Sequence, residues 1–373
     1  MSALPEIATV AVIGAGNGGC AAAVDLTQRG FEVRLWGRSA ATIEPLIAAD
    51  RIEHEGILGE GATAPALMTA DLARALDGAD LVLILGPTHA HEEIAGALAP
   101  YLTSQQIVMA APGHTLLLIP DTIRRLGGRF AAYCDATTLP YICRKLTPIR
   151  VRVSRAARVL LFAAFPGEIA AEAAARIGPV LPAIAPTPSL LHTVFPYTNA
   201  IHHPAALLLN VGRVESTAGD YCHYFDGITP AVGRLIDALD AERIAVAAGF
   251  GIATEPLPDY FFRIGYTSAE GRAGGAHGVF HHSEPNRWIK APATIDHRFF
   301  NEDVPFGLVA LSELGRLAGV ATGIVDAVIA VASAVAGRSF RAEGLTLQRM
   351  GIAGLSPEQL VALLRSGNRG DAE

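Results

Sequence analysis

The stretch that most constrains the fold of this chain is VAVIGAGNGG, from Val10 to Gly19. Its first residues form a β-branched apolar run, which is typical of a strand buried on both faces. Gly14, Gly16 and Gly19 then fall at the spacing G-x-G-x-x-G. The first glycine permits a tight turn, the second lets the backbone approach a pyrophosphate, and the third lets the next helix pack closely on the strand. The stretch therefore predicts a strand, a turn and a helix start that cradle a dinucleotide.

The residues after the cradle continue the β-α-β alternation. Good helix composition over 20–29 ends at Gly30, and a second strand is expected over 31–36. Further strands are expected at 81–85 and 106–111, with a helix over 91–102 between them. Apolar runs at 130–133, 149–153 and 159–165 should complete the domain. This order predicts an α/β fold with an N-terminal Rossmann-type, doubly wound parallel sheet.

The second half of the chain has a different pattern. Four prolines between residues 178 and 189 indicate a linker, so we expect a dinucleotide-binding domain over 1–185 and a second domain over 186–373. Strand signals fade beyond the linker, and Thr229 precedes Pro230 as an N-cap would. Helices are expected at 204–213, 230–249, 305–317 and 323–336. The C-terminal domain should therefore be mostly α-helical.

Composition excludes several classes of protein. The net charge of −7 and the lack of a basic run argue against nucleic acid as a partner. The four cysteines show no C-x-x-C spacing, which favours reduced thiols in a cytoplasm, and we expect no signal peptide. Residues 318–337 approach the roughly 20 residues of a membrane span. Because they contain Asp326 and are rich in Gly and Ala, a buried core helix is the better interpretation.

Hydride transfer, a common task of such a fold, needs a proton donor or acceptor. The chain has only two lysines, Lys145 and Lys290, but twelve histidines. His202 and His203 follow the linker and precede Pro204, where the two domains should face each other. A histidine there could transfer a proton. From spacing alone, a histidine at a helix start on a polar surface is the better interpretation.

A second candidate stretch is IKAPATIDHRFFNEDVPFGLV, residues 289–309. Asp303 could cap a helix that begins near Pro305, or it could orient a histidine and stabilise its charged form. Arg298 could hold a substrate carboxylate in a bidentate contact, or it could lie on the surface. Spacing alone does not decide between these alternatives.

Several motifs together resemble the opine dehydrogenases, the octopine/nopaline dehydrogenase family. The resemblance runs from Thr9 to about Ser333. It is carried by VAVIGAGNGG, TTLPYICR, NAIHHPAALLLN, FDGITPAVGRLIDALDAER and the stretch 289–309. It implies an oxidoreductase that joins the amine of an amino acid to a 2-oxo acid and reduces the imine with a nicotinamide cofactor. Pyruvate is the oxo acid that the resemblance implies.

By position, the resemblance places the catalytic histidine on His203 and its partner aspartate on Asp303. It places Arg298 on the oxo-acid carboxylate, and Cys143 and Asn199 on the substrate side. Cys143 could also be simply a small buried residue. The stretch PGHTLLLIPD departs from a Gly-rich segment that is frequent in the family.

A histidine-rich segment lies apart from these motifs. His277, His281, His282 and Glu284 could suggest a metal site by composition, but a Gly-rich loop on the substrate side is the better interpretation. We therefore expect no metal.

The cofactor itself should be NADP(H) rather than NAD(H), although NAD(H) is compatible. Asn17 and Gly18 belong to the cradle with the three glycines already named, and Pro87 follows a strand where a nicotinamide ribose would lie. The second strand ends in LWGRS without the acidic residue that binds the ribose hydroxyls of NAD. Arg38 and Ser39 could instead hold a 2′-phosphate.

The main prediction is thus an NADPH-dependent, reversible imine reductase of the opine dehydrogenase type. Two alternatives remain open at this point: a simple 2-oxo acid or 2-hydroxy acid oxidoreductase on the same fold, and a non-catalytic dinucleotide-binding sensor. The expected partners are small molecules, with no nucleic acid and no membrane, and a homodimer is one compatible assembly. The sequence does not specify the amine, the oxo acid or the stereochemistry of the product.

Overall fold

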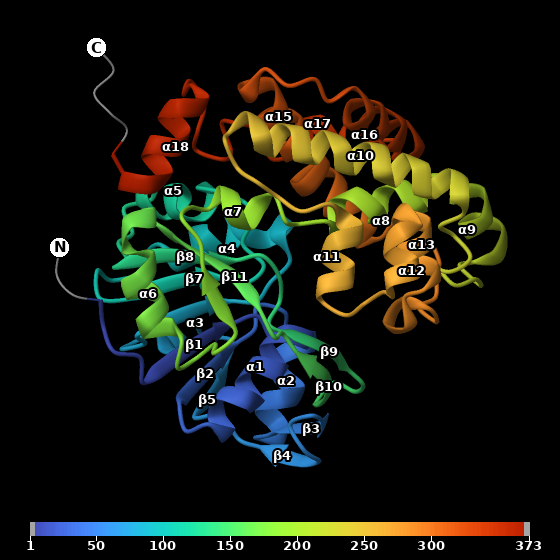
Figure 1. Cartoon of the computed structure of the whole chain (residues 1–373). Coiled ribbons are helices and arrows are strands. Elements are labelled where there is room, and N and C mark those ends of the chain that lie inside the picture. Colours follow the sequence, from blue (N-terminus) through green and yellow to red (C-terminus); the bar gives the residue numbers. More distant parts are fainter. Residues whose placement is uncertain (1–3, 369–373) are drawn as a thin grey trace. The chain divides into compact units, whose positions relative to one another are not determined.

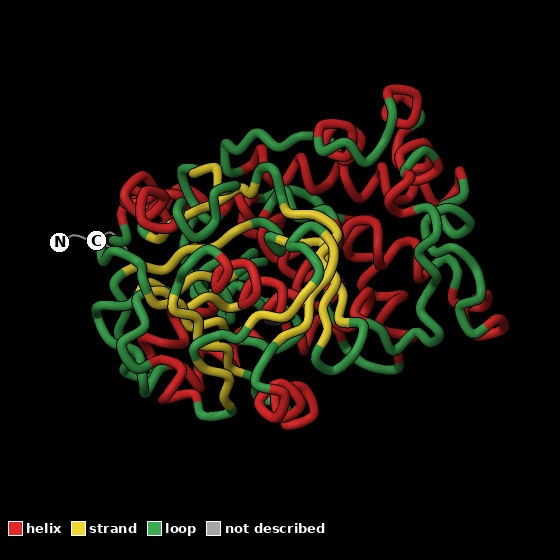
Figure 2. Tube along the Cα trace, turned by 90° about the horizontal axis from the view of Figure 1, so that it is seen from below, coloured by secondary structure: helices red, strands yellow, loops and turns green. Residues whose placement is uncertain are grey.

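The computed structural model describes residues 4–368, which form two compact units (Figure 1). Among the described residues, the first unit ends at Val194 and takes in the chain again from Val361 to Asn368. The second unit is Phe195–Leu360. The expected boundary after residue 185 lies close to this division in the chain, but the C-terminal segment joins the first unit and not the second. Strands are concentrated in the first unit, and the second is built from helices and loops (Figure 2).

The first unit is built on an eight-stranded sheet. Its strands, in spatial order, are β12 (Ile184–Pro186), β11 (Leu160–Phe165), β8 (Ala132–Ala136), β7 (Ile107–Ala110), β6 (Leu81–Ile84), β1 (Thr9–Ile13), β2 (Glu32–Trp36) and β5 (Leu67–Thr69). The strands from β8 to β5 pair in parallel, whereas β11 is antiparallel to β8. β1, β6, β7 and β8 are buried along their whole length, as parallel strands covered on both faces must be. The predicted Rossmann-type sheet is confirmed.

The helices of this unit are short and cover the sheet. They are α1 (Asn17–Gln28), α2 (Ala40–Ala49), α3 (Leu72–Leu76), α4 (His91–Leu98), α5 (Leu118–Arg125), α6 (Ala170–Ile177) and α7 (Leu191–Val194), and α18 (Pro357–Ser366) joins the unit at Val361. α4 ends at Leu98, earlier than the helix expected over 91–102. α1 is buried from Gly18 to Val24, because its small residues let layers approach from both sides.

A second, four-stranded sheet packs against α1. Its strands, in spatial order, are β4 (Gly61–Thr63), β3 (Ile52–Gly56), β10 (Arg150–Ala156) and β9 (Tyr141–Lys145). The apolar run at 149–153 therefore completes the unit as part of this sheet and not of the main one. The antiparallel pair β9–β10 brings Cys143 opposite Val153 and places Lys145 beside the start of α1.

The strand order fixes where a ligand can bind. β1 lies between β2, which follows it in the chain, and β6, which comes later. In open α/β sheets, ligands bind outside the carboxyl ends of the strands at such a switch point. The loops that follow β1, from Gly14, and β6, from Leu85, leave the sheet there.

The second unit is helical, with α10 (Pro230–Gly249) at its centre. α10 contacts α8 (Asn199–Leu208), α13 (Gly275–His281), α15 (Val309–Ala318) and α16 (Gly323–Ala336). Its remaining helices are α9 (Val211–Thr217), α11 (Leu257–Arg263), α12 (Ala269–Ala273), α14 (Arg298–Asn301) and α17 (Phe340–Glu343). Thr229 accepts a hydrogen bond from the backbone N–H of Val232, which confirms the predicted N-cap of α10.

Two predicted helix starts are wrong, and both errors involve proline. α8 begins at Asn199 and contains Pro204 in its interior. A π-helical turn over Val304–Leu308 precedes α15, so no regular helix starts at Pro305. Pro204 lies inside α8, where packing against neighbouring helices outweighs the local preference for a break, whereas Pro305 lies at the first residues of the π-helical turn, where proline is tolerated.

The apolar stretch 318–337 is interrupted. Gly319 adopts a left-handed conformation at the end of α15, and α16 begins only at Gly323. Among the described residues, the structure contains no helix whose length and apolar content would let it cross a membrane.

A carboxyl group is fully buried in the first unit, on β8. Asp135 has no exposed surface, and its Oδ1 accepts a hydrogen bond of 2.7 Å from the hydroxyl of Thr193. Its Oδ2 has no hydrogen-bond partner within residues 4–368. Burial raises the pKa of this carboxyl to about 8, and the hydrogen bond from Thr193 opposes that shift. Asp135 is therefore protonated in the folded chain at pH 6, where an unfolded aspartate is ionised.

Asp135→Asn should change how stability depends on pH. Because the folded pKa lies above the unfolded one, the contribution of Asp135 to stability is fully present below about pH 4 and is lost as the pH rises toward 8. The neutral amide has no such loss. Measured by calorimetry between pH 5 and 8, the Tm of the variant minus that of the wild type should increase with pH. Asp77→Asn, on an exposed side chain, serves as the control. A Tm difference that stays constant would contradict the burial argument.

Candidate active site

The turn between β1 and α1 has the geometry that its glycines predict. Gly14 has a φ of +118°, and its N–H donates to the carbonyl oxygen of Trp36. A Cβ on Gly19 would lie 1.6 Å from the carbonyl oxygen of Gly14, so only glycine allows this close contact. A Cβ on Gly16 would meet nothing within 4 Å, which leaves its backbone approachable. Gly18 packs under the side chain of Leu139.

The start of α1 has a basic neighbour that the motif does not contain. Asn17 accepts a hydrogen bond of 2.8 Å from the backbone N–H of Lys145, and Lys145 Nζ lies 3.4 Å from the carbonyl oxygen of Ala15. The first turn of a helix presents unpaired N–H groups and a partial positive charge, and a lysine beside it adds a full charge. Sequence reasoning considered Lys145 only as a proton donor. Its place beside the cradle depends on the pairing of β9 with β10, which no local pattern encodes.

The end of β2 carries the residues expected to select the cofactor. Arg38 and Ser39 are exposed between Trp36 and α2. Arg38 forms an ion pair with Glu93 on α4. An exposed pair of this kind contributes only about 0–1 kcal/mol, so a phosphate could compete for the guanidinium. Pro87, also exposed, precedes a short 3₁₀ turn after β6.

In the second unit, α8 carries His203 into a buried position. His203 Nδ1 lies 2.8 Å from Asp303 Oδ2, and the two residues are 100 positions apart in the chain. Asp303 has no exposed surface, and its Oδ1 accepts a hydrogen bond of 2.6 Å from Tyr197. The side chain of Asp303 makes no helix-capping hydrogen bond, so the capping alternative is wrong. Spacing could not show that the histidine and the aspartate meet, and the structure brings them together.

The approach of Asp303 to α8 depends on a glycine. The π-helical turn Val304–Leu308 directly follows Asp303 and packs on α8. A Cβ on Gly307 would lie 2.3 Å from the Cβ of Ala200, so this contact needs glycine. Turns of π geometry are frequent at functional sites.

Burial moves the pKa values of both members of this pair. It raises the pKa of Asp303 to about 7, whereas the hydrogen bond from Tyr197 and the charge of Arg298 act in the opposite direction. Burial also lowers the pKa of His203, and the neighbouring Arg298 and His297 lower it further. Burial therefore favours the neutral form of both side chains.

A third group, Tyr224, completes the polar contacts of His203. Its hydroxyl lies 2.8 Å from His203 Nε2. No signal in the sequence indicates this contact, since Tyr224 lies in the irregular segment between α9 and α10. The role of Tyr224 becomes visible only from the contact of its segment with His203 on α8.

Aromatic rings enclose His203 on its remaining sides. Phe299 stacks on His203 with ring centroids 4.0 Å apart, and His202 packs edge-on at 4.4 Å. His223 packs near Phe299 at 4.7 Å, and neither of its ring nitrogens has a hydrogen-bond partner within the described part of the chain. Burial lowers the pKa of His202 and brings that of His223 to about 3, so both rings are neutral.

Arg298 extends from α14 close to the pair. Its side chain is 53% exposed, and its Nη2 contacts the buried Glu302 at 3.1 Å. The guanidinium has five donors, so this contact leaves others for a second carboxylate. Arg298 thus has an exposed side chain, as one of the two alternatives predicted. Its charge nevertheless lies close enough to His203 and Asp303 to shift the pKa of both.

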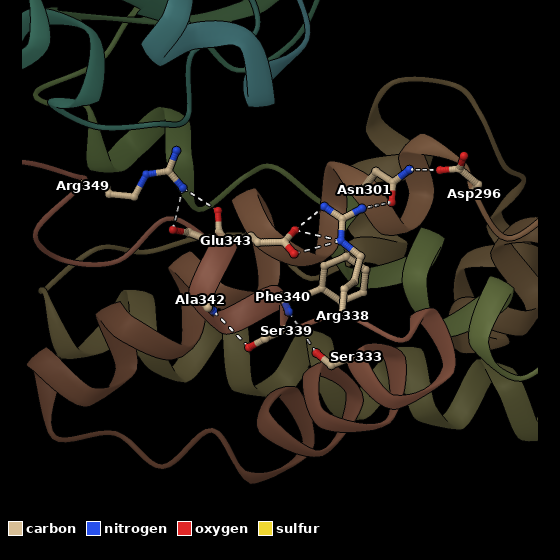
Figure 3. A network of polar contacts seen from close by, with 10 residues as sticks. Asp296, Asn301, Ser333, Arg338, Ser339, Phe340, Ala342, Glu343 and Arg349 are labelled. Atoms are coloured by element: carbon tan, nitrogen blue, oxygen red, sulfur yellow. Dashed lines mark hydrogen bonds and ion pairs between the residues drawn. The ribbon is translucent and has the colours of Figure 1, made fainter.

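A polar network fixes α14 from its other end (Figure 3). Asn301 donates a hydrogen bond of 2.6 Å to Asp296 and accepts one from Arg338. Arg338 also forms an ion pair with Glu343 on α17. The turn that carries Arg298 and Phe299 is thereby tied to α17.

The remaining predicted residues lie elsewhere. Asn199, the first residue of α8, is half-buried on the same helix as His203. Cys143 is half-buried on β9 in the first unit, and burial raises the pKa of its thiol to about 12. It is therefore a neutral thiol and not a nucleophile.

The histidine-rich segment is helical and not the loop that its composition suggested. α12 and α13 cover residues 269–273 and 275–281, and His277 Nδ1 lies 2.7 Å from the carbonyl oxygen of Ile228. Between residues 4 and 368, no group of three or more His, Cys, Asp or Glu side chains is placed to hold a metal ion.

Two family models match separate parts of the chain. Residues 186–336 match the family described as NAD/NADP octopine/nopaline dehydrogenase, alpha-helical domain. Residues 9–118 match the N-terminal part of NAD-dependent glycerol-3-phosphate dehydrogenase.

Relatives match over nearly the whole length. An opine dehydrogenase of Arthrobacter sp. (strain 1C) is 34% identical over 94% of this chain and 97% of its own length. Vitopine synthase of Allorhizobium ampelinum is 25% identical over 96% of this chain and 99% of its own length. Among solved structures, octopine dehydrogenase in complex with NADH and agmatine has a TM-score of 0.76 at 20% identity, covering 95% of this chain and 97% of that one. Yersinopine dehydrogenase with bound NADP+ has a TM-score of 0.74 at 14% identity, and the match covers 96% of this chain and 98% of that one. This chain belongs to the opine dehydrogenase family of NAD(P)-dependent oxidoreductases that act on CH–NH groups.

Proposed function

We propose that this enzyme joins the amine of an amino acid to a 2-oxo acid and reduces the resulting imine, with NADPH as the preferred cofactor. The observation that carries the proposal is the buried hydrogen bond between His203 and Asp303, in a chain whose other unit is a dinucleotide fold. The bound cofactor would supply the hydride. The Asp303–His203 pair would supply the proton that reduction requires and take it back in the reverse reaction.

The groups around the pair suit a carboxylate substrate. Arg298 keeps guanidinium donors available although it contacts Glu302, and its charge lies close enough to shift the pKa of both His203 and Asp303. A 2-oxo acid bound there through its carboxylate would place its reacting carbon near the proton donor. Cys143 and Asn199 are the further residues that we assign to the substrate side.

The cofactor would bind at the cradle. Gly14, Gly16, Asn17, Gly18 and Gly19 fit a pyrophosphate, because the turn is open at Gly16 and faces the N-terminus of α1. Lys145 would add a charge next to the phosphates. Arg38 and Ser39 would hold the 2′-phosphate of NADPH, and Pro87 would border the nicotinamide side.

A matrix of amines against 2-oxo acids, with both cofactors, tests the reaction. We expect NADPH oxidation that requires both an amino acid and a 2-oxo acid, pyruvate among them, with a secondary amine detected by mass spectrometry. Oxidation with a 2-oxo acid alone, unchanged by any amine, would instead identify a simple 2-oxo acid reductase. Tight cofactor binding without turnover of any combination would identify a sensor.

His203→Asn and Asp303→Asn test the pair. Each should lower kcat by roughly 10² to 10⁴, the contribution of a positioned acid–base group. His282→Asn, which changes an exposed histidine, is the matched control and should leave kcat unchanged. Both site variants are compared with the wild type by circular dichroism and by cofactor binding. A correctly folded His203→Asn enzyme with wild-type turnover would refute the assignment.

Arg38→Ala and Glu93→Gln test the cofactor preference. The measured quantity is the ratio of kcat/KM for NADPH to that for NADH. Arg38→Ala should lower the ratio about 10- to 100-fold, because hydrogen bonds to a charged phosphate contribute about 1.5–3 kcal/mol. Glu93→Gln should raise it, by up to about fivefold, because it frees Arg38 from an exposed ion pair.

Glu92→Gln makes the same change of charge one position away and pairs with Arg125 instead, so it should leave the ratio unchanged. A wild-type enzyme that uses NADH as well as NADPH, with a ratio insensitive to Arg38, would show that this residue does not select the cofactor.

A further inference from the structure

Three buried groups form one hydrogen-bonded line in the second unit. Asp303 Oδ2 contacts His203 Nδ1 at 2.8 Å, and His203 Nε2 contacts the Tyr224 hydroxyl at 2.8 Å. An imidazole has only two nitrogens, and Asp303 occupies one of them. Nε2 is therefore the nitrogen that could reach a substrate, but the phenol already occupies it. A substrate must either displace Tyr224 or meet its hydroxyl.

The packing of Tyr224 opposes its displacement. Its ring stacks on Phe280 with centroids 5.2 Å apart and planes 12° from parallel, and it packs edge-on against His223 at 4.8 Å. Only 7% of the residue is exposed. Moving the phenol off Nε2 would break these ring contacts and take from the Tyr224 hydroxyl its hydrogen bond with His203.

The segment that carries Tyr224 is held by its own hydrogen bonds. The N–H of Cys222 donates to Asp226 Oδ2 at 2.8 Å, and the N–H of His223 donates to the carbonyl oxygen of Ile289 at 2.8 Å. Asn210 donates from its side chain to the carbonyl oxygen of Gly227 at 3.0 Å. Both flanks of Tyr224 are thus tied to neighbouring parts of the same unit.

We propose that Tyr224 is a further catalytic residue, the terminal proton donor of an Asp303–His203–Tyr224 relay whose hydroxyl meets the reacting nitrogen of the substrate. This rests on the proposed function. As hydride reaches the imine carbon and reduces it, the Tyr224 O–H bond breaks and its proton forms the N–H bond of the product. His203 Nε2–H replaces that proton on the phenol oxygen, and Asp303 Oδ2–H replaces it on Nδ1. The line ends with an ionised Asp303, and after the product leaves a proton from solvent returns to Asp303 along the same line, through the Tyr224 hydroxyl and His203.

The surroundings keep the terminal phenol of the relay protonated. Burial raises the pKa of Tyr224, so the phenol carries the proton that the relay passes to the substrate. Other titratable or charged groups face the line from the elements packed around it. They are Tyr197, His202, His223, His297, Arg298 and Glu302. Arg298 and His297 oppose a positive charge on His203, which favours passing the proton onward.

Tyr224→Phe and Tyr221→Phe in the full-length enzyme test the relay. Both remove one phenol hydroxyl from the same segment, but the Tyr221 hydroxyl has no hydrogen-bond partner within the described residues. Tyr224→Phe should lower kcat about 10²-fold or more with little change in KM, and Tyr221→Phe should leave both unchanged. If the substrate instead displaces Tyr224 and contacts His203 directly, Tyr224→Phe will keep kcat within about threefold of wild type, and the proposal is overturned.

A second variant separates catalysis from positioning. Replacing Tyr224 with 3,5-difluorotyrosine keeps the ring and the hydroxyl but makes the phenol more acidic. The alkaline limb of the kcat profile should then move to lower pH. An unchanged profile, alongside a loss in Tyr224→Phe, would show that Tyr224 only holds His203 in place and would overturn the relay. The fluorinated variant also decides the matter if Tyr224→Phe does not fold.

The same variants distinguish this proposal from the proposed function. If the wild type reduces 2-oxo acids without an amine, imine reduction fails as the function. The comparison is then made on that carbonyl reduction, where the relay would protonate the carbonyl oxygen and the same loss in Tyr224→Phe is expected.

Discussion

The second unit is organised around a carboxyl group that has no contact with solvent. A buried carboxylate is costly unless its oxygens are hydrogen-bonded, and Asp303 satisfies both oxygens with side chains, Tyr197 and His203. This requirement fixes the relative positions of α8 and the π-helical turn after Asp303. Gly307 allows the close contact between them, and the network through Asn301 and Arg338 holds α14 in place. The acid–base pair is therefore also a structural link of the fold.

The first unit depends on a different constraint, the close approach of backbone to backbone. Gly19 lies so near Gly14 that no side chain fits, and this contact positions the start of α1 at the carboxyl end of β1. β9, through Lys145, then adds a positive charge beside the same helix start. Neither the glycine contact nor Lys145 contributes to recognition of the nucleobase or of the substrate. Together they provide the fixed N–H groups and the charge that a pyrophosphate needs, whichever substrate the second unit binds.

Both units contain a buried aspartate with a raised pKa, but the two have different surroundings. Asp135 contacts one hydroxyl, and its second oxygen has no partner within residues 4–368, so no titratable side chain is hydrogen-bonded to it there. Asp303 faces an imidazole, which can accept a proton and pass it along its ring. A shifted pKa alone thus does not indicate catalysis. A connected line of donors and acceptors does, and only Asp303 belongs to such a line.

The sequence by itself determined the glycine turn, the parallel sheet, the helical second unit and the candidates His203, Asp303 and Arg298. These features depend on local spacing, periodicity or a resemblance carried by contiguous motifs. The sequence placed the start of α8 wrongly, because tertiary packing outweighs the local preference of Pro204, and it did not indicate the π-helical turn that precedes α15. Only the tertiary structure decided that His203 meets Asp303, that Glu93 pairs with Arg38, and that Lys145 reaches the cradle. Tyr224 was likewise absent from the sequence interpretation. These contacts join segments that are far apart in the chain or irregular in conformation, and their distances are set by how helices and strands pack, which no local pattern records.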